Sequence, residues 1–259
     1  MNNPSPLQTP VKKNIGMVHS FETCGAVDGP GLRFVVFLEG CPLRCAYCCN
    51  RDMLDLEDYM HMSPDDVLAE IQKYKAYFGK KGGVTISGGD PIYQPEFVLE
   101  LLKLLQHEGI HTALDTSMFA PLQTIQLLMP YTDLFMISLK HFDTKMHEEL
   151  TMVPNERILE NINYLNSQIK KHAHQSPKIW FRYVVLPGYT DTKQNLDALL
   201  SFLKDKEFEL IELLPYHTLG KHKWDKLGLK YKLEEVKSPS RKSLQSITEI
   251  LQSEGYSVQ

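Results

Sequence analysis

The chain has 259 residues, of which 42% are hydrophobic and 23% are charged, and its formal net charge is -4. This composition is that of an ordinary globular protein, long enough for a substantial core. It excludes a global attraction to nucleic acid or to an anionic membrane. No apolar run approaches the ~18 residues of a membrane span, so we expect no membrane partner.

The first 14 residues are polar and interrupted by prolines, so we expect a flexible lead rather than a signal peptide. The chain has five cysteines, and four of them lie between residues 41 and 49. An odd, crowded set is no disulfide framework. It predicts a reducing, cytoplasmic location.

Six segments have the apolar, β-branched character of buried strands. After an extended piece at 15–23, they are expected at 33–39, 83–87, 111–115, 134–140, 179–186 and 208–214. Helices are expected at 63–78, 95–107, 121–128, 155–170, 192–203 and 241–252. The first helix has the clearest start, because Ser63 can cap it, Pro64 occupies its first position and two acids follow.

Strands that alternate with helices pair in parallel, and repeated right-handed crossovers curl such a sheet. Six units favour a partial, TIM-like (β/α)6 barrel with outer helices over a closed barrel of eight, and a doubly wound open sheet is the alternative. No proline-rich linker divides residues 15–259, so we expect one domain. In either α/β architecture, ligands bind at the carboxyl ends of the strands.

The loop after the first predicted strand places Cys41, Cys45 and Cys48 within eight residues. Thiolates this close repel one another unless a metal centre lies between them. An iron-sulfur cluster normally takes four cysteines, so three would leave one iron open to a substrate. Two alternatives remain: a zinc site completed by Cys24 or Cys49, and reduced structural thiols.

Other polar residues follow the remaining predicted strands. Gly88 and Gly89 let a backbone approach a ligand closely, and Asp90 could hold an ammonium group. Lys140 and Arg182 could bind a carboxylate. Asp115, Thr116, Ser138, Leu139 and His217 stand at the same ends. Each alone is more often a turn or surface residue, but together with the cysteines they describe a pocket for an amino acid beside a metal centre.

The cysteine loop, C-x3-C-x2-C with Tyr47 before its third cysteine, resembles the radical S-adenosylmethionine motif. VDGPGLRF at 27–34 and the GG-acidic turn at 88–90 resemble the glycyl-radical-enzyme activating group. WFRYVVLPG (180–188) and IELLPYHTLGKHKW (211–224) are similar to its pyruvate formate-lyase branch. The chain has one cysteine motif, without the ferredoxin-like insertion of many relatives, which favours the same branch. The likeness runs from residue 15 to the C-terminus.

The resemblance implies an oxidoreductase with one [4Fe-4S] cluster that cleaves S-adenosylmethionine after an electron arrives from flavodoxin or ferredoxin. The 5'-deoxyadenosyl radical so formed takes a hydrogen atom from a glycine of the partner, expected to be pyruvate formate-lyase. We also expect a monomer. The alternatives are an activase for a different glycyl radical enzyme and a zinc-bound, non-catalytic interaction module.

The same resemblance implies a role for each candidate residue by its position in the motifs. The cluster ligands are Cys41, Cys45 and Cys48. The methionyl amino group binds to Gly88, Gly89 and Asp90, and the adenine lies near Tyr47 and Cys49. The rest of the cofactor contacts Ser138, Leu139, Lys140, Arg182 and His217. Asp28, in the VDGPG turn, helps to hold the partner's glycine loop, and Asp115 and Thr116 contribute to a monovalent cation site.

Three residues depart from the family's pattern. Asp90 is one methylene shorter than the usual Glu, and Cys49 replaces a histidine. Ser138 stands where the family has an Asp that helps to bind the cation. We therefore expect a weaker contact to the amino group, a cation site with a single carboxylate, and an additional thiol beside the cluster.

A basic stretch lies near the C-terminus. Between Lys221 and Lys242 the chain has eight Lys or Arg residues against three acids. The stretch is either a solvated loop or, as the resemblance would allow, a docking face for an acidic electron donor such as flavodoxin.

Overall fold

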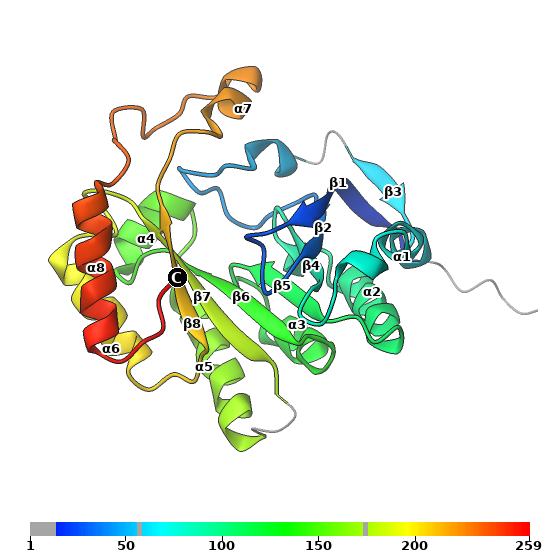
Figure 1. Cartoon of the computed structure of the whole chain (residues 1–259). Helices are drawn as coiled ribbons and strands as arrows, with labels where there is room; N and C mark the ends of the chain where they lie inside the picture. Colours follow the sequence, from blue (N-terminus) through cyan, green and yellow to red (C-terminus); the bar gives the residue numbers. More distant parts are fainter. Residues whose placement is uncertain (1–13, 56–58, 173–175) are drawn as a thin grey trace, which may run out of the picture.

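The computed structural model describes residues 14–55, 59–172 and 176–259. These residues form one sheet of eight strands in the order β3-β1-β2-β4-β5-β6-β7-β8 (Figure 1). The strands are β1 (Gly16–Gly25), β2 (Arg33–Leu38), β3 (Met60–Met62), β4 (Gly83–Gly88), β5 (Thr112–Thr116), β6 (Leu134–Leu139), β7 (Lys178–Val185) and β8 (Leu210–Pro215). The predicted lead at 1–14 lies outside the described residues apart from Asn14, whose amide donates to Glu100 (2.7 Å).

Strands β2 and β4 to β8 pair in parallel, as the alternation of strands and helices predicted. β1 runs antiparallel to both β2 and β3. The sheet does not close, because β3 forms one edge and β8 the other. The C-terminus covers the β8 edge, where the backbone N–H groups of Ile211 and Leu213 donate to the carbonyls of Ser257 and Gln259 (both 2.9 Å).

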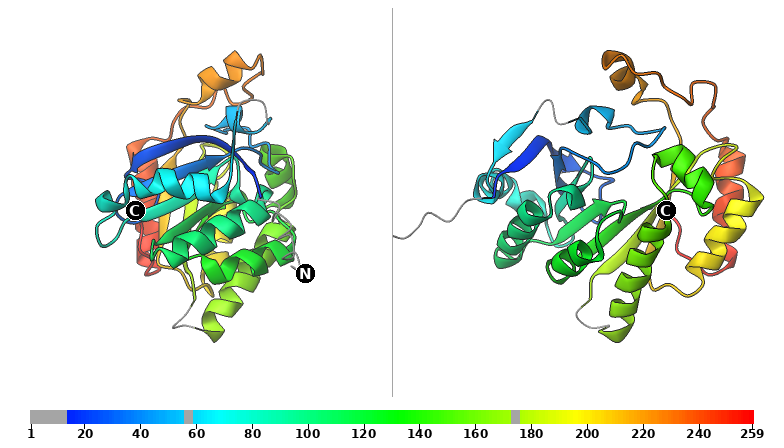
Figure 2. Two further views of the ribbon diagram at one scale, coloured as in Figure 1. Left: turned by 90° about the vertical axis from the view of Figure 1, so that its right-hand side faces the viewer. Right: turned by 180° about the vertical axis from the view of Figure 1, so that it is seen from behind.

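The helices of the described residues lie outside the sheet (Figures 1 and 2). They are α1 (Pro64–Gln72), α2 (Pro95–His107), α3 (Leu122–Leu128), α4 (Thr144–Thr151), α5 (Glu156–Lys171), α6 (Lys193–Leu203), α7 (Lys221–Lys226) and α8 (Arg241–Ser253). A doubly wound sheet would carry helices on both faces, so the expected partial barrel describes this open sheet better. Within the described ranges, no helix is long and apolar enough to cross a membrane.

The first helix begins as predicted. The Ser63 hydroxyl accepts the backbone N–H of Asp66 (3.2 Å), and the Asp66 carboxylate accepts that of Ser63 (2.9 Å). Its predicted end was wrong, since α1 stops at Gln72 and a short 3-10 turn, Lys75–Tyr77, follows. Phe78 is nevertheless buried in the core. The spacing of apolar residues therefore predicted which side chains are buried, but not where the helix ends.

The two faces of the sheet differ in polarity because side chains alternate along each strand. Ile86, Ile137 and Phe181 point toward the helices and are fully buried in the main core. On the opposite, inner face a smaller apolar cluster consists of Ala113, Leu134, Met136 and Trp180. Polar residues replace apolar ones on the inner face toward the carboxyl ends, which is where a ligand site was expected.

Candidate active site

A cavity of about 250 Å³ lies at the carboxyl ends of the parallel strands. It brings together most of the predicted site residues: Cys41, Cys45, Tyr47, Cys48, Cys49, Gly88, Gly89, Asp90, Asp115, Thr116, Ser138, Lys140 and Arg182. These residues come from the cysteine loop and from the ends of β4, β5, β6 and β7. The rule for parallel sheets therefore located the pocket correctly.

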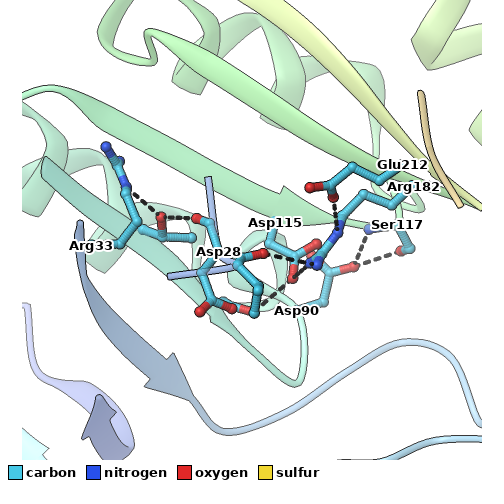
Figure 3. Close-up of polar contacts among 10 residues, drawn as sticks. Asp28, Arg33, Asp90, Asp115, Ser117, Arg182 and Glu212 are labelled. Atoms are coloured by element: carbon cyan, nitrogen blue, oxygen red, sulfur yellow. Dashed lines mark hydrogen bonds and ion pairs between the residues drawn. The ribbon is translucent and has the colours of Figure 1, made fainter. Parts of the chain in front are cut away.

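Three predicted site residues do not line the cavity. Leu139 alternates with Ser138 on β6, so its side chain lies in the core and leaves only its backbone for a ligand. His217 follows β8 and is exposed, with its Nδ1 accepting the N–H of Leu219 (3.3 Å). Asp28 lies on the turn before β2, beside Arg182 (Figure 3).

The cysteine loop is held by two elements that are distant from it in sequence. At the end of α4, the carbonyl of Thr151 accepts a hydrogen bond from the backbone N–H of Arg44, and the carbonyl of Leu150 accepts one from that of Ala46 (both 2.8 Å). On the other side, α7 lies against the loop (Figure 1), and the indole of Trp224 donates to the carbonyl of Cys48 (2.9 Å). The loop therefore has a fixed backbone.

The Gly-Gly turn packs directly on the cysteine loop. Gly88 has φ +114°, a conformation that favours glycine. A Cβ added to Gly89 would lie 2.2 Å from the carbonyl oxygen of Gly40, so a side chain would separate the turn from the loop. The backbone N–H of Asp90 donates to that same carbonyl (2.9 Å).

Asp90 is buried, and both oxygens of its carboxylate are engaged. Oδ1 accepts the Thr116 hydroxyl (2.8 Å) and the N–H of Ile92 (3.3 Å). Oδ2 accepts the N–H (2.9 Å) and the hydroxyl (2.5 Å) of Ser117. Burial raises the pKa of Asp90, and these hydrogen bonds oppose the rise because they stabilise the anion. The carboxylate is thus fixed at the cavity wall by the end of β5.

Arg182 is surrounded by three carboxylates (Figure 3). Its Nη1 lies 3.1 Å from Asp115 and its Nε lies 2.8 Å from Glu212. Burial disfavours the guanidinium charge, but Asp115, Glu212 and Asp28 outweigh it and raise the pKa of Arg182. Burial also raises the pKa of Asp28, which Arg182 partly offsets. This part of the wall carries one cation among three acids.

Tyr47 and Lys140 form the wall beside the cysteines. The Tyr47 hydroxyl is buried and has no hydrogen-bond partner among the described residues. The ammonium of Lys140 lies 5.7 Å from the centre of the Tyr47 ring, within reach of a cation-π contact. An unpaired buried hydroxyl costs stability, which suits a position that a bound molecule completes.

The three thiols fit a cluster that brings positive charge. Burial raises the pKa of Cys41, of Cys45 and, to about 12, of Cys48. Each thiolate would also repel its neighbours, and Lys140 offsets this only in part for Cys45 and Cys48. Iron between the sulfurs would supply the missing charge and stabilise the thiolates as ligands.

A single metal ion fits less well. Within the described part of the chain, no three His, Cys, Asp or Glu side chains converge closely enough to hold one ion. A zinc site needs four ligands around one point, whereas a cluster binds each sulfur at a separate iron. Cys24, one of the two candidates for a fourth zinc ligand, is exposed on β1 and does not line the cavity.

The monovalent cation site that the resemblance suggested is poorly provided with ligands. Asp115 already accepts Arg182 and the hydroxyl of Ser87 (2.9 Å). The Thr116 hydroxyl donates to Asp90, and Ser138 brings no charge. A cation here would have one carboxylate, shared with Arg182, and neutral hydroxyl oxygens as its ligands.

Sequence reasoning missed Ser87, Ser117 and Glu212. Ser87 lines the cavity and donates to Asp115, and Ser117 directly follows the Asp115-Thr116 pair and binds Asp90. Glu212 stands opposite Arg182 in the β7–β8 register. Alternation along the strands could have indicated Ser87, but pairing Glu212 with Arg182 required the register of two strands.

The chain is similar in sequence to a known superfamily and to known enzymes. The radical SAM superfamily matches residues 35–200. The pyruvate formate-lyase 1-activating enzyme of Escherichia coli (strain K12) is 42% identical over 94% of this chain and 98% of that relative. The pyruvate formate-lyase-activating enzyme of Staphylococcus aureus (strain USA300) is 40% identical over 89% of this chain and 93% of that relative.

Solved structures give the same result. A domain of pyruvate-formate lyase-activating enzyme from Bacteroides vulgatus matches with a TM-score of 0.54 and 30% identity, covering 69% of this chain and 98% of that one. A radical SAM methyltransferase from Sphaerobacter thermophilus matches with a TM-score of 0.64 over 88% of this chain and 65% of that one. Its identity is 18%, so it supports the fold alone.

The fold and the three-cysteine cavity thus define a radical SAM enzyme, whose cofactors are a [4Fe-4S] cluster and S-adenosylmethionine. Within that superfamily, the chain belongs to the family of pyruvate formate-lyase-activating enzymes.

Proposed function

We propose that this chain activates pyruvate formate-lyase by generating a radical on one of its glycines. The observation that carries the proposal is the convergence of three cysteines, a Gly-Gly-Asp turn and two cations on one cavity. The proposal is supported by the names of the relatives in E. coli and S. aureus. We further propose a cytoplasmic location, consistent with five free cysteines.

In this proposal Cys41, Cys45 and Cys48 ligate the cluster. When bound, the reduced cluster supplies the electron that cleaves S-adenosylmethionine into methionine and a 5'-deoxyadenosyl radical, which takes a hydrogen atom from the partner's glycine. The chain's contribution is to hold the cysteine loop rigid and to line the cavity with the groups that orient S-adenosylmethionine.

The remaining wall residues orient S-adenosylmethionine. The amino group binds to Asp90 and to the backbone of the Gly88-Gly89 turn, because an ammonium requires acceptors. The carboxylate binds to Lys140, the wall cation that has no carboxylate partner within 4.0 Å among the described residues. The adenine lies against Tyr47 and Cys49. Leu139 contributes its backbone only.

The partner's glycine loop enters beside Asp28 and Arg182, on the inner face of the sheet. The side chain of Val27, next to Asp28, is 69% exposed and available for contact. Electrons arrive from flavodoxin or ferredoxin at the lysines of α7 and the loop after it, where an acidic protein would be attracted. Lys221 is paired with Glu234 and Lys223 with Asp52, so Lys226, Lys230 and Lys232 are the stronger candidates.

Anaerobic reconstitution with iron and sulfide, followed by reduction and addition of S-adenosylmethionine and pyruvate formate-lyase, tests the proposal. The expected result is the EPR doublet of a glycyl radical on the lyase. Cleavage of S-adenosylmethionine without that doublet would indicate a different glycyl radical enzyme as the partner. Zinc in place of iron and sulfide would instead support the non-catalytic interaction module.

A further inference from the structure

The turn before β2 lies across the inner face of the sheet, where the proposed function places the partner's glycine loop. The carbonyl of Asp28 accepts the hydroxyl of Thr85 on β4 (2.6 Å). The carbonyl of Val27, the preceding residue, accepts the side chain of Arg182 on β7 (3.4 Å). A Cβ added to Gly29, the following residue, would lie 3.5 Å from the sulfur of Met136 on β6. Residues 27–29 are therefore held against side chains of β4, β6 and β7 at once.

Arg33, which ends the VDGPGLR motif, holds the turn from the side opposite Arg182 (Figure 3). Its side chain is fully buried, and its Nε donates to the Thr85 hydroxyl (2.9 Å). Nη2 donates to the carbonyls of Val84 (2.5 Å) and His111 (3.3 Å). Nη1 lies 3.2 Å from Nδ1 of His111 and 3.5 Å from the carbonyl of Pro30, within the turn.

These partners are unusual for a buried guanidinium. They are neutral oxygens and a ring nitrogen, and no carboxylate of the described residues lies within ion-pair distance of Arg33. Burial lowers the pKa of Arg33 to about 10, and the more distant carboxylates of Asp133 and Asp28 offset this only in part. The buried guanidinium instead hydrogen-bonds to three segments of the chain, 30–33, 84–85 and 111, and so fixes their backbones relative to one another.

Two glycines leave room for the Arg33 side chain and for the turn that it holds. A Cβ on Gly83 would lie 2.9 Å from Nη1 of Arg33 and 2.1 Å from the carbonyl oxygen of His111. Gly31 has φ +69°, and a Cβ there would lie 2.5 Å from the backbone nitrogen of Gly82. Neither site has room for a side chain, so the turn has little freedom to shift while Arg33 remains in place.

Thr85 connects the Arg33 side chain to Asp28 in the turn. Its hydroxyl accepts from Arg33 and donates to the carbonyl of Asp28, so a single side chain transmits the position of the guanidinium to the residue beside Arg182. Thr85 is fully buried and does not line the cofactor cavity.

We propose that Arg33 and Thr85 are positioning residues for the partner's polypeptide: they set the turn so that Asp28 and Val27 meet the glycine loop. This inference rests on the proposed function, because it assigns the turn to the partner and not to the cofactor. It predicts that loosening these contacts weakens binding of the loop while leaving binding of S-adenosylmethionine intact.

The decisive variant is Thr85→Val, which keeps the buried shape and removes the hydroxyl. Binding of a synthetic peptide that carries the glycine loop of pyruvate formate-lyase is measured by calorimetry on the reconstituted enzyme with S-adenosylmethionine and no reductant. The expected affinity is about tenfold lower, the scale of one lost buried hydrogen bond. Binding of S-adenosylmethionine and its reductive cleavage without peptide should change by less than about twofold.

Thr85→Ser is the matched control, since it keeps the hydroxyl, and it should bind the peptide within about twofold of the unmodified chain. Arg33→Lys keeps the charge but loses the fork of donors, and it should resemble Thr85→Val. Peptide affinity unchanged in Thr85→Val overturns the inference, as does an equal loss of peptide and S-adenosylmethionine binding. An unmodified chain that binds no peptide and forms no radical on the lyase refutes the proposed function itself.

Discussion

At the scale of single residues, Asp90 explains what a shorter acid does in this site. Its two oxygens accept four donors from Ile92, Thr116 and Ser117, so the carboxylate is part of the wall as well as a candidate ligand for an ammonium. A longer side chain could reach further into the cavity. Here the backbone of the Gly-Gly turn must share the work of binding the amino group.

Asp90→Asn should therefore affect both stability and cofactor binding. The amide nitrogen would face two donors, one hydroxyl and one backbone N–H, whichever oxygen it replaced. The hydroxyl can rotate to accept from the amide but the N–H cannot, so one buried hydrogen bond is lost, at a cost of about 1–3 kcal/mol in the free energy of unfolding. Loss of the charge should weaken binding of S-adenosylmethionine by at least about tenfold. Urea denaturation and calorimetry measure the two effects.

Asp143→Asn is a suitable control for that substitution. Asp143 caps α4 by accepting the N–H of Met146 (2.9 Å), and asparagine caps equally well. Its stability and cofactor affinity should stay close to those of the unmodified chain. A similar loss in both variants would contradict a specific role for Asp90.

Most residues that line the cavity could be predicted from the sequence, because reactive and polar residues directly follow or end the predicted strands there. Two of the predicted site residues, Leu139 and His217, do not line the cavity, for two different reasons. Leu139 was included with its neighbours although alternation turns its side chain into the core. His217 lies exposed in the loop between β8 and α7, and the path of such a loop is not encoded in a local pattern.

At the scale of elements, the cysteine loop depends on α4 and α7, which the sequence did not reveal. α4 has eight residues, and of the three that it buries, His147, Leu150 and Thr151, only Leu150 is apolar, so its buried face is hard to recognise in the sequence. α7 has six residues and buries Trp224 alone. Both form because they pack against the loop, a long-range contact that local patterns do not record.

The end of α4 carries strain that can be tested. Met152 adopts φ +67°, a conformation that costs free energy for any residue except glycine, and its side chain is 60% exposed. Met152→Gly should raise the free energy of unfolding by about 0.5–1 kcal/mol, measured by urea denaturation. Glu148→Gly, in the middle of the same helix and exposed, should lower it by about 1 kcal/mol. Equal losses in both variants would show that Met152 is not strained.

The contact from α7 predicts a role in retaining the cluster. Trp224→Phe removes the hydrogen bond to the Cys48 carbonyl, worth about 1 kcal/mol, and should release iron to a chelator several-fold faster. Trp180→Phe is the control, because its indole donates to Glu209 (2.9 Å) at the amino ends of the strands. Iron release is followed by absorbance, and the reduced cluster by EPR. Indistinguishable rates in the two variants would exclude this role.

At the scale of the whole molecule, the fold places rigid polar groups on the inner face of an open sheet and closes the amino end with apolar side chains. The alternation of six strands and their helices made this architecture predictable. The position of the VDGPG turn was not predictable, because it depends on an antiparallel β1 and on Arg33, a charged residue whose burial no local pattern indicates. The same burial makes the stability of the molecule depend on pH.

Two histidines, the partly buried His111 and the fully buried His147, contribute to that dependence. Burial and the nearby Arg33 lower the pKa of His111, which also faces Asp133 and Lys178, and burial lowers the pKa of His147. Below the ordinary histidine pKa of about 6.5, the unfolded chain therefore binds protons that the folded chain does not. The free energy of unfolding should fall as pH drops through this window, by up to about 1.4 kcal/mol per pH unit for each histidine.

Buried carboxylates oppose this trend, because Asp28 and Glu212 have raised pKa values and bind protons more readily in the folded chain. The contribution of His111 is isolated by comparison with His111→Asn, whose side-chain oxygen can replace Nδ1 as the neighbour of Arg33. Urea denaturation of the unmodified chain and of His111→Asn, at constant ionic strength from about pH 8 to about pH 5.5, should give curves that diverge below about pH 6.5. The unmodified chain should lose more stability, since only it must keep a neutral imidazole beside a buried guanidinium. Parallel curves would mean that His111 does not titrate against Arg33.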